Sequence, residues 1–118
     1  LEVQLNRSSF TNNDNMTIKL LPSRSMFVAV FNWTEEYGFV LLVNKRIDSR
    51  IQLPDDPRIQ WRTYLNDDQP SDEMMVVLAS DMQMNFKLKY TDEQFVMISQ
   101  KLAKMGVLVR KISFTINP

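Results

Sequence analysis

The sequence contains no histidine and no cysteine, and only two of its 118 residues are glycine. Without imidazole or thiol groups, the chain can form no Ser-His-Asp triad, no Cys-His pair, no disulfide and no ordinary zinc site. Gly38 and Gly106 are too few to build a glycine-rich loop that cradles phosphates. We therefore expect no cofactor, and no enzyme activity that depends on these groups.

Charge of one sign is also lacking, because 14 Lys and Arg residues balance 14 Asp and Glu residues. A net charge of zero gives no electrostatic reason to expect nucleic acid or an anionic membrane as a partner. The longest strongly apolar run, residues 26–31, is far shorter than the roughly 18 residues of a membrane span. The chain starts at Leu1 with no leader, which we interpret as a single domain, residues 1–118, excised from a larger protein.

What the sequence does contain is a series of short apolar segments separated by polar turns. The turns, rich in Asn, Asp, Ser, Thr and Pro, lie at residues 11–15, 34–36, 54–57 and 66–72. This spacing is typical of an all-β protein. Alternation of apolar and polar residues predicts half-buried antiparallel strands. The segments concerned are residues 16–20, 47–53, 59–65, 84–90 and 111–116.

Three further segments, residues 26–31, 39–43 and 74–79, are apolar on both faces. Strands of this kind must be covered on both sides, so we expect them at the centre of the sheet system. The first two are joined by a short turn in which Gly38 supplies an unusual backbone angle. The side chains expected to be nearly fully buried are Phe27, Val30, Leu42, Val76 and Leu78.

Residues 92–105 are predicted to form one amphipathic helix. Thr91 and Gln94 have the spacing of a capping box, and Gly106 lies where a left-handed C-terminal residue is wanted. The predicted apolar stripe consists of Phe95, Ile98, Leu102 and Met105. This stripe can cover a strand that is apolar on both faces. The pattern as a whole predicts a mainly β fold, an antiparallel, immunoglobulin-like β-sandwich of about seven or eight strands with one covering helix near the C-terminus.

Neighbouring carboxylates are the candidate catalytic groups. A glycosidase needs two carboxyl groups that face each other across a cleft, one of them with a raised pKa. The neighbouring acids are Glu35-Glu36, Asp55-Asp56, Asp67-Asp68, Asp72-Glu73 and Asp92-Glu93. Each pair falls in a predicted turn or helix start, where backbone preferences already favour acids. The polar run at residues 12–15 lacks the spacing of a calcium loop, so a solvated turn is the preferred interpretation.

Aromatic residues supply the candidate contacts for a ligand or partner. Trp61 is predicted to be a core residue, because it is in phase with Ile59 and Leu65. Trp33 and Tyr37 flank the predicted hairpin tip, where exposure and burial are about equally expected. These two residues are our candidate contacts for a carbohydrate or a protein. We predict no catalytic, cofactor-binding or metal-binding residue.

The segment SMFVAVFNW at residues 25–33 is followed by FVLLVN at residues 39–44. This pair of strands resembles a bacterial family known as domain of unknown function 4384, in which an aromatic-V-A-V-F-N strand leads to an L-L-F-P-N-like motif. IQLP at residues 51–54 is similar to the I-P step of that family. EMMVVLA at residues 73–79 is similar to its E-x-x-V-V-x-A-T strand. The chain departs from the family where the proline is missing at Val43-Asn44.

The resemblance implies a β-sandwich module of a larger bacterial protein that is exported or lipid-anchored, with a periplasmic, cell-envelope or secreted location. The absence of cysteine is compatible with the periplasm and with the cytoplasm. The family has no known catalytic residues, so none is carried over. Our first hypothesis is a non-enzymatic accessory or protein-interaction module, whose partners are other domains of the parent chain or another protein. The alternative is a carbohydrate-binding module, and a carboxylate-only glycosidase is the least favoured.

Overall fold

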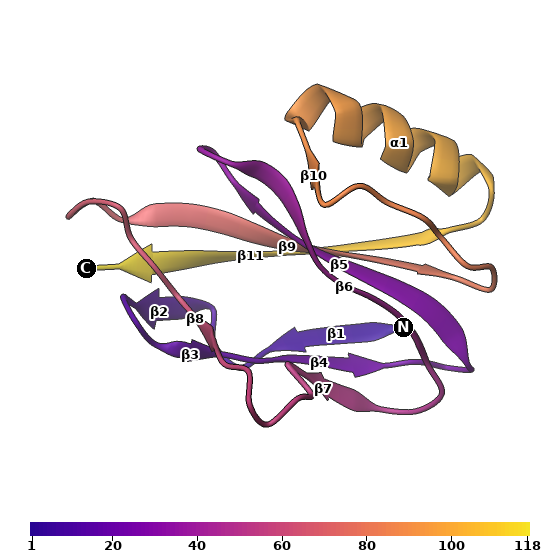
Figure 1. The fold of residues 1–118 in the computed structure, drawn as a ribbon, viewed down its shortest axis with the longest axis horizontal. Coiled ribbons are helices and arrows are strands. Elements are labelled where there is room, and N and C mark those ends of the chain that lie inside the picture. Colours follow the sequence, from indigo (N-terminus) through magenta and orange to yellow (C-terminus); the bar gives the residue numbers. More distant parts are fainter.

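Eleven β-strands and one α-helix make up the computed structural model, which describes residues 1–118 (Figure 1). The strands are β1 (Glu2–Leu5), β2 (Ser9–Thr11), β3 (Asn15–Met16), β4 (Ile18–Leu21), β5 (Met26–Thr34), β6 (Gly38–Ile47), β7 (Ile51–Leu53), β8 (Trp61–Arg62), β9 (Ser71–Ser80), β10 (Lys89–Tyr90) and β11 (Leu108–Asn117); the helix α1 spans Asp92–Lys104. The mainly β class is confirmed. The strands outnumber the seven or eight predicted, because several are only two or three residues long.

The strands form three open sheets. The largest has the order β10-β6-β5-β9-β11-β2, and the others are β1-β4-β7 and β3-β8. The three doubly apolar segments are the strands β6, β5 and β9, so their predicted central position is confirmed. The predicted purely antiparallel arrangement is wrong at one pair, because β2 runs parallel to β11, with Phe10 opposite Ile116. The large sheet is therefore mixed.

Two apolar clusters explain why the central strands are apolar on both faces. An inter-sheet cluster lies between the large sheet and the two small sheets: Phe10, Met16, Ile18, Leu20, Met26, Val28, Val30, Ile47, Leu53, Leu65, Met75, Val77, Ala79, Phe114 and Ile116. A helix-side cluster lies on the opposite face of the large sheet, beneath α1 (Figure 1): Ala29, Phe31, Phe39, Val76, Leu78, Met84, Tyr90, Phe95 and Val107. Successive residues of β5, such as Val28 and Ala29, enter the two clusters in turn.

The helix begins and ends close to the predicted positions. Thr91 is the N-cap, and its hydroxyl accepts from the backbone N–H of Gln94 while the Gln94 side chain accepts from the backbone N–H of Thr91. Gly106 has a φ of +85° just after the helix, as a left-handed C-terminal residue requires. Phe95 is the buried residue of the predicted stripe. Met105 is 55% exposed, because it is the C-cap rather than part of the last helical turn.

A β-bulge in β6 overturns one part of the predicted core. Val30 is paired with Val43 and Phe31 with Leu41, which leaves Leu42 as an extra residue without a partner on β5. Leu42 is 37% exposed, so its predicted burial is wrong. Phe39 belongs to the helix-side cluster before the bulge, and Ile47 belongs to the inter-sheet cluster after it. The bulge therefore reverses which side chains of β6 face each cluster, and it directs Leu42 away from both clusters.

The other expected core residues divide into two groups. Val30, Val76 and Leu78 are fully buried, as predicted, whereas Phe27 is only half-buried at the margin of the helix-side cluster. The predicted strand at residues 84–90 is wrong except for β10, and Leu88 is 76% exposed. This stretch crosses the large sheet as an irregular segment that supplies Met84 and Tyr90 to the helix-side cluster. The one helix is too short and too polar to cross a membrane.

Candidate functional site

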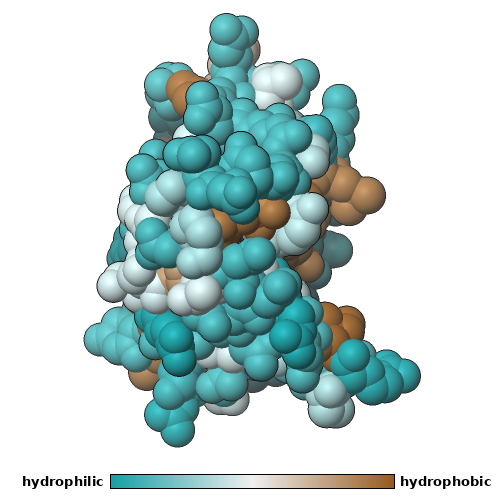
Figure 2. All heavy atoms as spheres, turned by 90° about the vertical axis from the view of Figure 1, so that its left-hand side faces the viewer, coloured by the Kyte–Doolittle hydropathy of each residue, from teal (hydrophilic) through white to brown (hydrophobic).

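A cleft of about 700 Å³ opens at the end of the molecule where the β5–β6 turn, residues 60–71 and the end of β11 come together. The space-filling view from this end shows a recessed apolar area surrounded by hydrophilic residues (Figure 2). The deepest lining residues belong to the inter-sheet cluster, among them Met16, Met75 and Phe114. The cleft is therefore an open extension of the space between the sheets.

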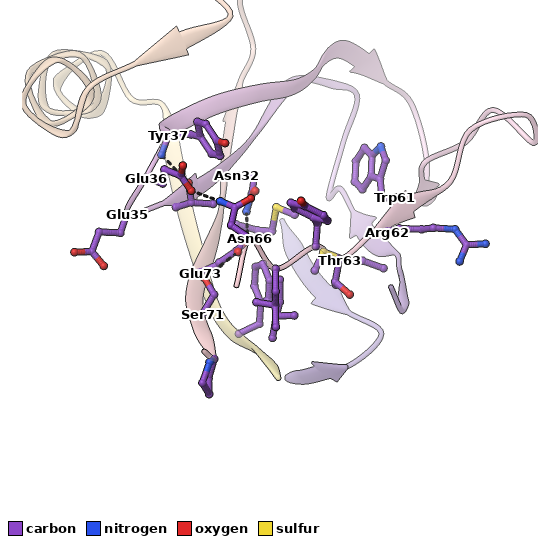
Figure 3. A pocket seen from close by; sticks show the side chains of 18 of the residues that line it. Asn32, Glu35, Glu36, Tyr37, Trp61, Arg62, Thr63, Asn66, Ser71 and Glu73 are labelled. Atoms are coloured by element: carbon purple, nitrogen blue, oxygen red, sulfur yellow. Dashed lines mark hydrogen bonds between the residues drawn. The ribbon is translucent and has the colours of Figure 1, made fainter. Parts of the chain in front are cut away.

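One side of the cleft is polar. Asn32, Asn66, Glu36 and Glu73 gather there, and the side chain of Trp61 stands on the opposite side (Figure 3). Glu73 accepts hydrogen bonds from the hydroxyl of Ser71 at 3.1 Å and from the amide of Asn32 at 3.4 Å. Asn66 donates to the carboxylate of Glu36 across the cleft mouth. These bonds hold amide and carboxylate groups at fixed places within a hollow that also has apolar surface.

Burial gives Glu73 a distinct electrostatic environment. It is half-buried, and burial raises the pKa of its carboxyl group above the ordinary value for glutamate, an effect partly offset by the hydrogen bonds from Ser71 and Asn32. Neither donor carries a charge, so the ionised carboxylate has no counter-ion within the protein. A partly buried carboxyl group with a shifted pKa in a cleft is a typical property of a binding or catalytic site.

The remaining walls of the cleft are aromatic and aliphatic. Tyr37, Trp61 and Tyr64 line it together with Leu42 and Leu65. Tyr64 lies just after β8 and is 68% exposed. The β-bulge places Leu42 in this wall, and bulges often redirect a side chain towards a functional site. The cleft thus combines apolar surface with a few placed polar groups, as ligand sites do.

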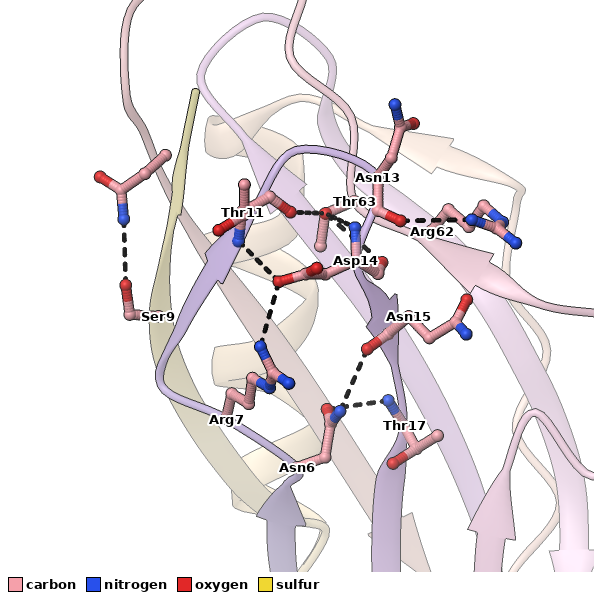
Figure 4. Close-up of polar contacts among 11 residues, drawn as sticks. Asn6, Arg7, Ser9, Thr11, Asn13, Asp14, Asn15, Thr17, Arg62 and Thr63 are labelled. Carbon is pink, nitrogen blue, oxygen red and sulfur yellow. Dashed lines mark hydrogen bonds and ion pairs between the residues drawn. The ribbon is translucent and has the colours of Figure 1, made fainter.

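The segment that carries Trp61 and Tyr64 is fixed by a polar network around Thr63, the one buried polar residue of the chain (Figure 4). The hydroxyl of Thr63 donates to the backbone oxygen of Thr11 at 2.7 Å and accepts from the backbone N–H of Asp14 at 3.0 Å. The backbone N–H of Thr63 donates to the backbone oxygen of Asp14 at 2.9 Å. This network ties the segment to the turn after β2 and keeps one wall of the cleft in place.

The polar run at residues 12–15 has a structural part in that network. Asn13 has a φ of +71°, which asparagine tolerates better than most residues. The carboxylate of Asp14 accepts from the backbone N–H of Thr11 at 2.8 Å and pairs with Arg7 at 3.3 Å. No group of three or more His, Cys, Asp or Glu side chains is placed to hold a metal ion anywhere in the chain. The turn interpretation describes this run better than a calcium loop does.

The structure separates the two aromatic residues proposed from the sequence. Tyr37 lines the cleft, and the ammonium group of Lys89 lies 5.3 Å from the centre of its ring. Trp33 is not among the residues that line the cleft. It packs on the helix-side cluster, and its indole N–H donates to the carboxylate of Asp92 at 2.8 Å, at the start of α1. Trp33 therefore anchors the helix, and Tyr37 alone of the pair belongs to the cleft.

The assignment of every carboxylate pair to a turn or helix start is wrong for Asp72-Glu73, since both residues lie in β9. Their side chains point to opposite faces of the sheet, because successive strand residues alternate. Asp72 accepts from the hydroxyl of Thr115 at 2.8 Å, while Glu73 lines the cleft. Sequence reasoning missed Glu73, although it shares the two-residue period of Met75 and Val77, which face the inter-sheet cluster.

The cleft does not meet the geometric condition for a glycosidase. Glu73 is half-buried, but the other carboxylate directed into the polar side, Glu36, is exposed in the β5–β6 turn. The carboxylate of Glu35 points away from the cleft (Figure 3). Two buried carboxyl groups that face each other, one as acid and one as base or nucleophile, are therefore absent from the cleft.

Comparisons with known proteins add no relative. No protein-family model, no curated protein and no solved structure matches this chain. The resemblance to domain of unknown function 4384 stays a prediction from the sequence.

Proposed function

We propose that this chain is a non-enzymatic binding module of a larger exported bacterial protein, and that its cleft takes a segment of a protein partner or of a neighbouring domain. The observation that carries the proposal is the cleft of about 700 Å³, in which the exposed rings of Tyr37 and Tyr64 and the partly buried ring of Trp61 lie beside amide and carboxylate groups. Exposed aromatic residues of this kind are enriched in the binding surfaces of proteins.

The chemistry of the cleft supports binding rather than catalysis. Proton transfer and nucleophilic attack are most often performed by His, Cys or an activated Ser, and the chain has neither imidazole nor thiol. The half-buried carboxyl group of Glu73 has no second buried carboxyl group opposite it. Its neighbours are amides and a hydroxyl, which orient a ligand without reacting with it.

Selection from a random peptide library displayed on phage tests the proposal. We expect the enriched peptides to shift the backbone amide resonances of residues 32–37, 60–67 and 71–75, which surround the cleft. Tyr64→Ala removes an exposed ring from the wall and should weaken binding at least about tenfold, as loss of an interface tyrosine does. The matched control is Leu88→Ala, which removes an equally exposed apolar side chain outside the cleft and should leave binding unchanged. Peptides that bind both variants equally would refute the proposal.

A carbohydrate is the second candidate ligand. The three aromatic rings of the cleft, together with the amides of Asn32 and Asn66, are the kind of groups that stack on sugar rings and bond to hydroxyl groups. Titration with neutral oligosaccharides, followed through the same backbone amide resonances, distinguishes a carbohydrate ligand from a peptide ligand. Shifts confined to the cleft that disappear in Tyr64→Ala would favour the carbohydrate, whereas no shift would leave the peptide proposal as the only one.

The proposal also includes a cellular location and a β-sandwich architecture. The similarity of residues 25–44 and 73–79 to an exported bacterial family supports a periplasmic, envelope or secreted location. The packing of the large sheet against two small sheets around one apolar cluster supports a β-sandwich. An immunoglobulin-like strand order stays a prediction. Determining the full-length gene product, with its leader and neighbouring domains, tests the location directly.

A further inference from the structure

The charges around the cleft are unbalanced. Its charged lining residues are Glu35, Glu36, Arg62, Asp67 and Glu73. The guanidinium group of Arg62 points away from the cleft (Figure 3) and donates to the backbone oxygen of Asn13 at 3.3 Å and to the side chain of Gln60 at 3.0 Å. None of the lining carboxylates belongs to an ion pair, although the molecule has five ion pairs elsewhere. The lining therefore has four carboxylates against one guanidinium group, and none of the four is in an ion pair.

Among the lining carboxylates, that of Glu73 is the least exposed to water. It is held by two neutral donors, the hydroxyl of Ser71 and the amide of Asn32, and it is half-buried. A cationic group at this place would make a charge-assisted hydrogen bond, which is stronger than the neutral bonds already present. Salt screens such a partly buried pair less than it screens a pair on the open surface.

The aromatic walls favour the same kind of group. Cations bind over the faces of Trp and Tyr rings, and Tyr37 already has the ammonium group of Lys89 5.3 Å from its ring centre. Trp61 and Tyr64 line the cleft without a cation of their own. Leu42 and Leu65 supply aliphatic surface, against which the methylene stem of a long basic side chain packs well.

We propose that the cleft recognises a lysine or arginine side chain in the partner segment, with the methylene stem against its aliphatic and aromatic walls and the charged head at Glu73. This inference rests on the proposed binding of a protein segment. It excludes acidic segments, because a carboxylate placed beside Glu73 would be repelled.

The test uses four pools of capped pentapeptides that share the same mixture of uncharged residues and differ only in the central residue, which is Lys, Arg, norleucine or Glu. Binding is followed through the fluorescence of Trp61 in a Trp33→Phe variant, since Trp33 and Trp61 are the two tryptophans of the chain. We expect the Lys and Arg pools to bind about tenfold more tightly than the norleucine pool, the usual effect of a hydrogen bond to a charged group. The Glu pool should bind most weakly.

Glu73→Gln keeps the size of the side chain and removes its charge. It should abolish the preference for Lys and Arg over norleucine while binding of the norleucine pool persists. The matched control is Glu2→Gln, which removes an exposed carboxylate of β1 outside the cleft and should leave the preference unchanged. Equal binding of all four pools would overturn the cationic specificity and leave the peptide site standing. No fluorescence change with any pool would overturn the proposed function as well.

Discussion

Beneath helix α1 the aromatic rings pack against one another, whereas three rings around the cleft, those of Tyr37, Trp61 and Tyr64, pair with no other ring. Phe31 makes edge contacts with Phe86 and Phe95 at 5.3 and 5.0 Å between ring centres, and Phe39 stacks on Phe95 at 3.9 Å. Tyr37, Trp61 and Tyr64 form no such pair. The rings beneath the helix therefore belong to the core, whereas the rings of Tyr37 and Tyr64 are exposed and available to a ligand.

The two regions also differ in how their polar groups are used. On the helix side, the indole N–H of Trp33 donates to the carboxylate of Asp92, and the hydroxyl of Tyr90 accepts from the backbone N–H of Lys87. In the cleft, the carboxylate of Glu73 has only neutral partners. These polar groups of the helix side thus have partners within the protein, whereas the carboxylate of Glu73 in the cleft has no counter-ion.

The largest expected difference between the regions is in stability. Phe31→Ala should lower the free energy of unfolding by about 3–5 kcal/mol, because it removes a fully buried ring and leaves a cavity. Tyr64→Ala should change it by less than about 0.5 kcal/mol, because the ring is largely exposed. Urea unfolding of both variants measures the difference. Similar losses in the two variants would show that the cleft ring is part of the core.

The two glycines should differ in how much stability is lost when each is replaced by alanine. Both have positive φ, but a Cβ atom at Gly38 would lie 2.6 Å from the backbone oxygen of Tyr90, whereas a Cβ atom at Gly106 meets nothing within 4 Å. Gly38→Ala should cost about 2–3 kcal/mol, and Gly106→Ala about 1 kcal/mol. Thermal unfolding measures both values. A smaller loss at Gly38 than at Gly106 would contradict the close approach of β10 to β6.

The next prediction concerns the N-cap of α1, which holds the first turn of the helix over the large sheet. Thr91→Ala removes one half of the capping box and should lower the free energy of unfolding by about 1 kcal/mol. Ser99→Ala, in the middle of the same helix, should have an effect of less than about 0.5 kcal/mol, because its hydroxyl caps nothing. Equal effects of the two substitutions, measured by urea unfolding, would argue against the capping interaction.

The smallest effect concerns the pH dependence of stability in the cleft. Burial raises the pKa of Glu73 in the folded protein, so the folded state binds this proton more tightly than the unfolded state does. The contribution of Glu73 to the free energy of unfolding therefore falls as pH rises from the ordinary glutamate pKa through the raised value. Glu73→Gln removes this fall, so the variant gains on the wild type over that interval by less than about 1 kcal/mol, because solvent screens a half-exposed group.

Unfolding curves at a series of pH values measure this gain as the difference between wild type and variant. The subtraction matters, because Asp55, Asp56 and Asp81 have lowered pKa values and an effect of opposite sign, which is lost as pH falls through those values. A difference for Glu73→Gln that does not grow with pH would contradict the burial of this carboxyl group.

The helix and the central strands could be predicted because their signals are local. The capping box at Thr91 and the doubly apolar segments of β5 and β9 need no knowledge of distant residues. The parallel pairing of β2 with β11 has no local signal, because the two strands lie at opposite ends of the chain. The bulge at Leu42 also escaped prediction, since a two-residue period cannot be traced through a segment in which every residue is apolar.

The cleft was only partly predictable for a related reason. Tyr37 was identified from its place at the hairpin tip, but Trp33, its neighbour there, points to the other face of the sheet. Glu73 follows the polar residues 66–72 and looked like the end of a turn, although it is a strand residue. The position of Trp61 and Tyr64 depends on hydrogen bonds from Thr63 to the turn after β2, which connect residues about fifty positions apart.

The bulge has a consequence for which changes of sequence this fold tolerates. Because Leu42 is the extra residue of β6, the residues on either side of it pair with consecutive residues of β5, whatever side chain stands at this position. If Leu42 were deleted, Leu41 would still lie opposite Phe31 and Val43 opposite Val30, so Val43 and Ile47 would keep their face of the sheet. Replacement of Leu42 by a polar residue would change only the cleft wall. Loss or replacement of Leu42 is therefore expected to alter the cleft rather than the core.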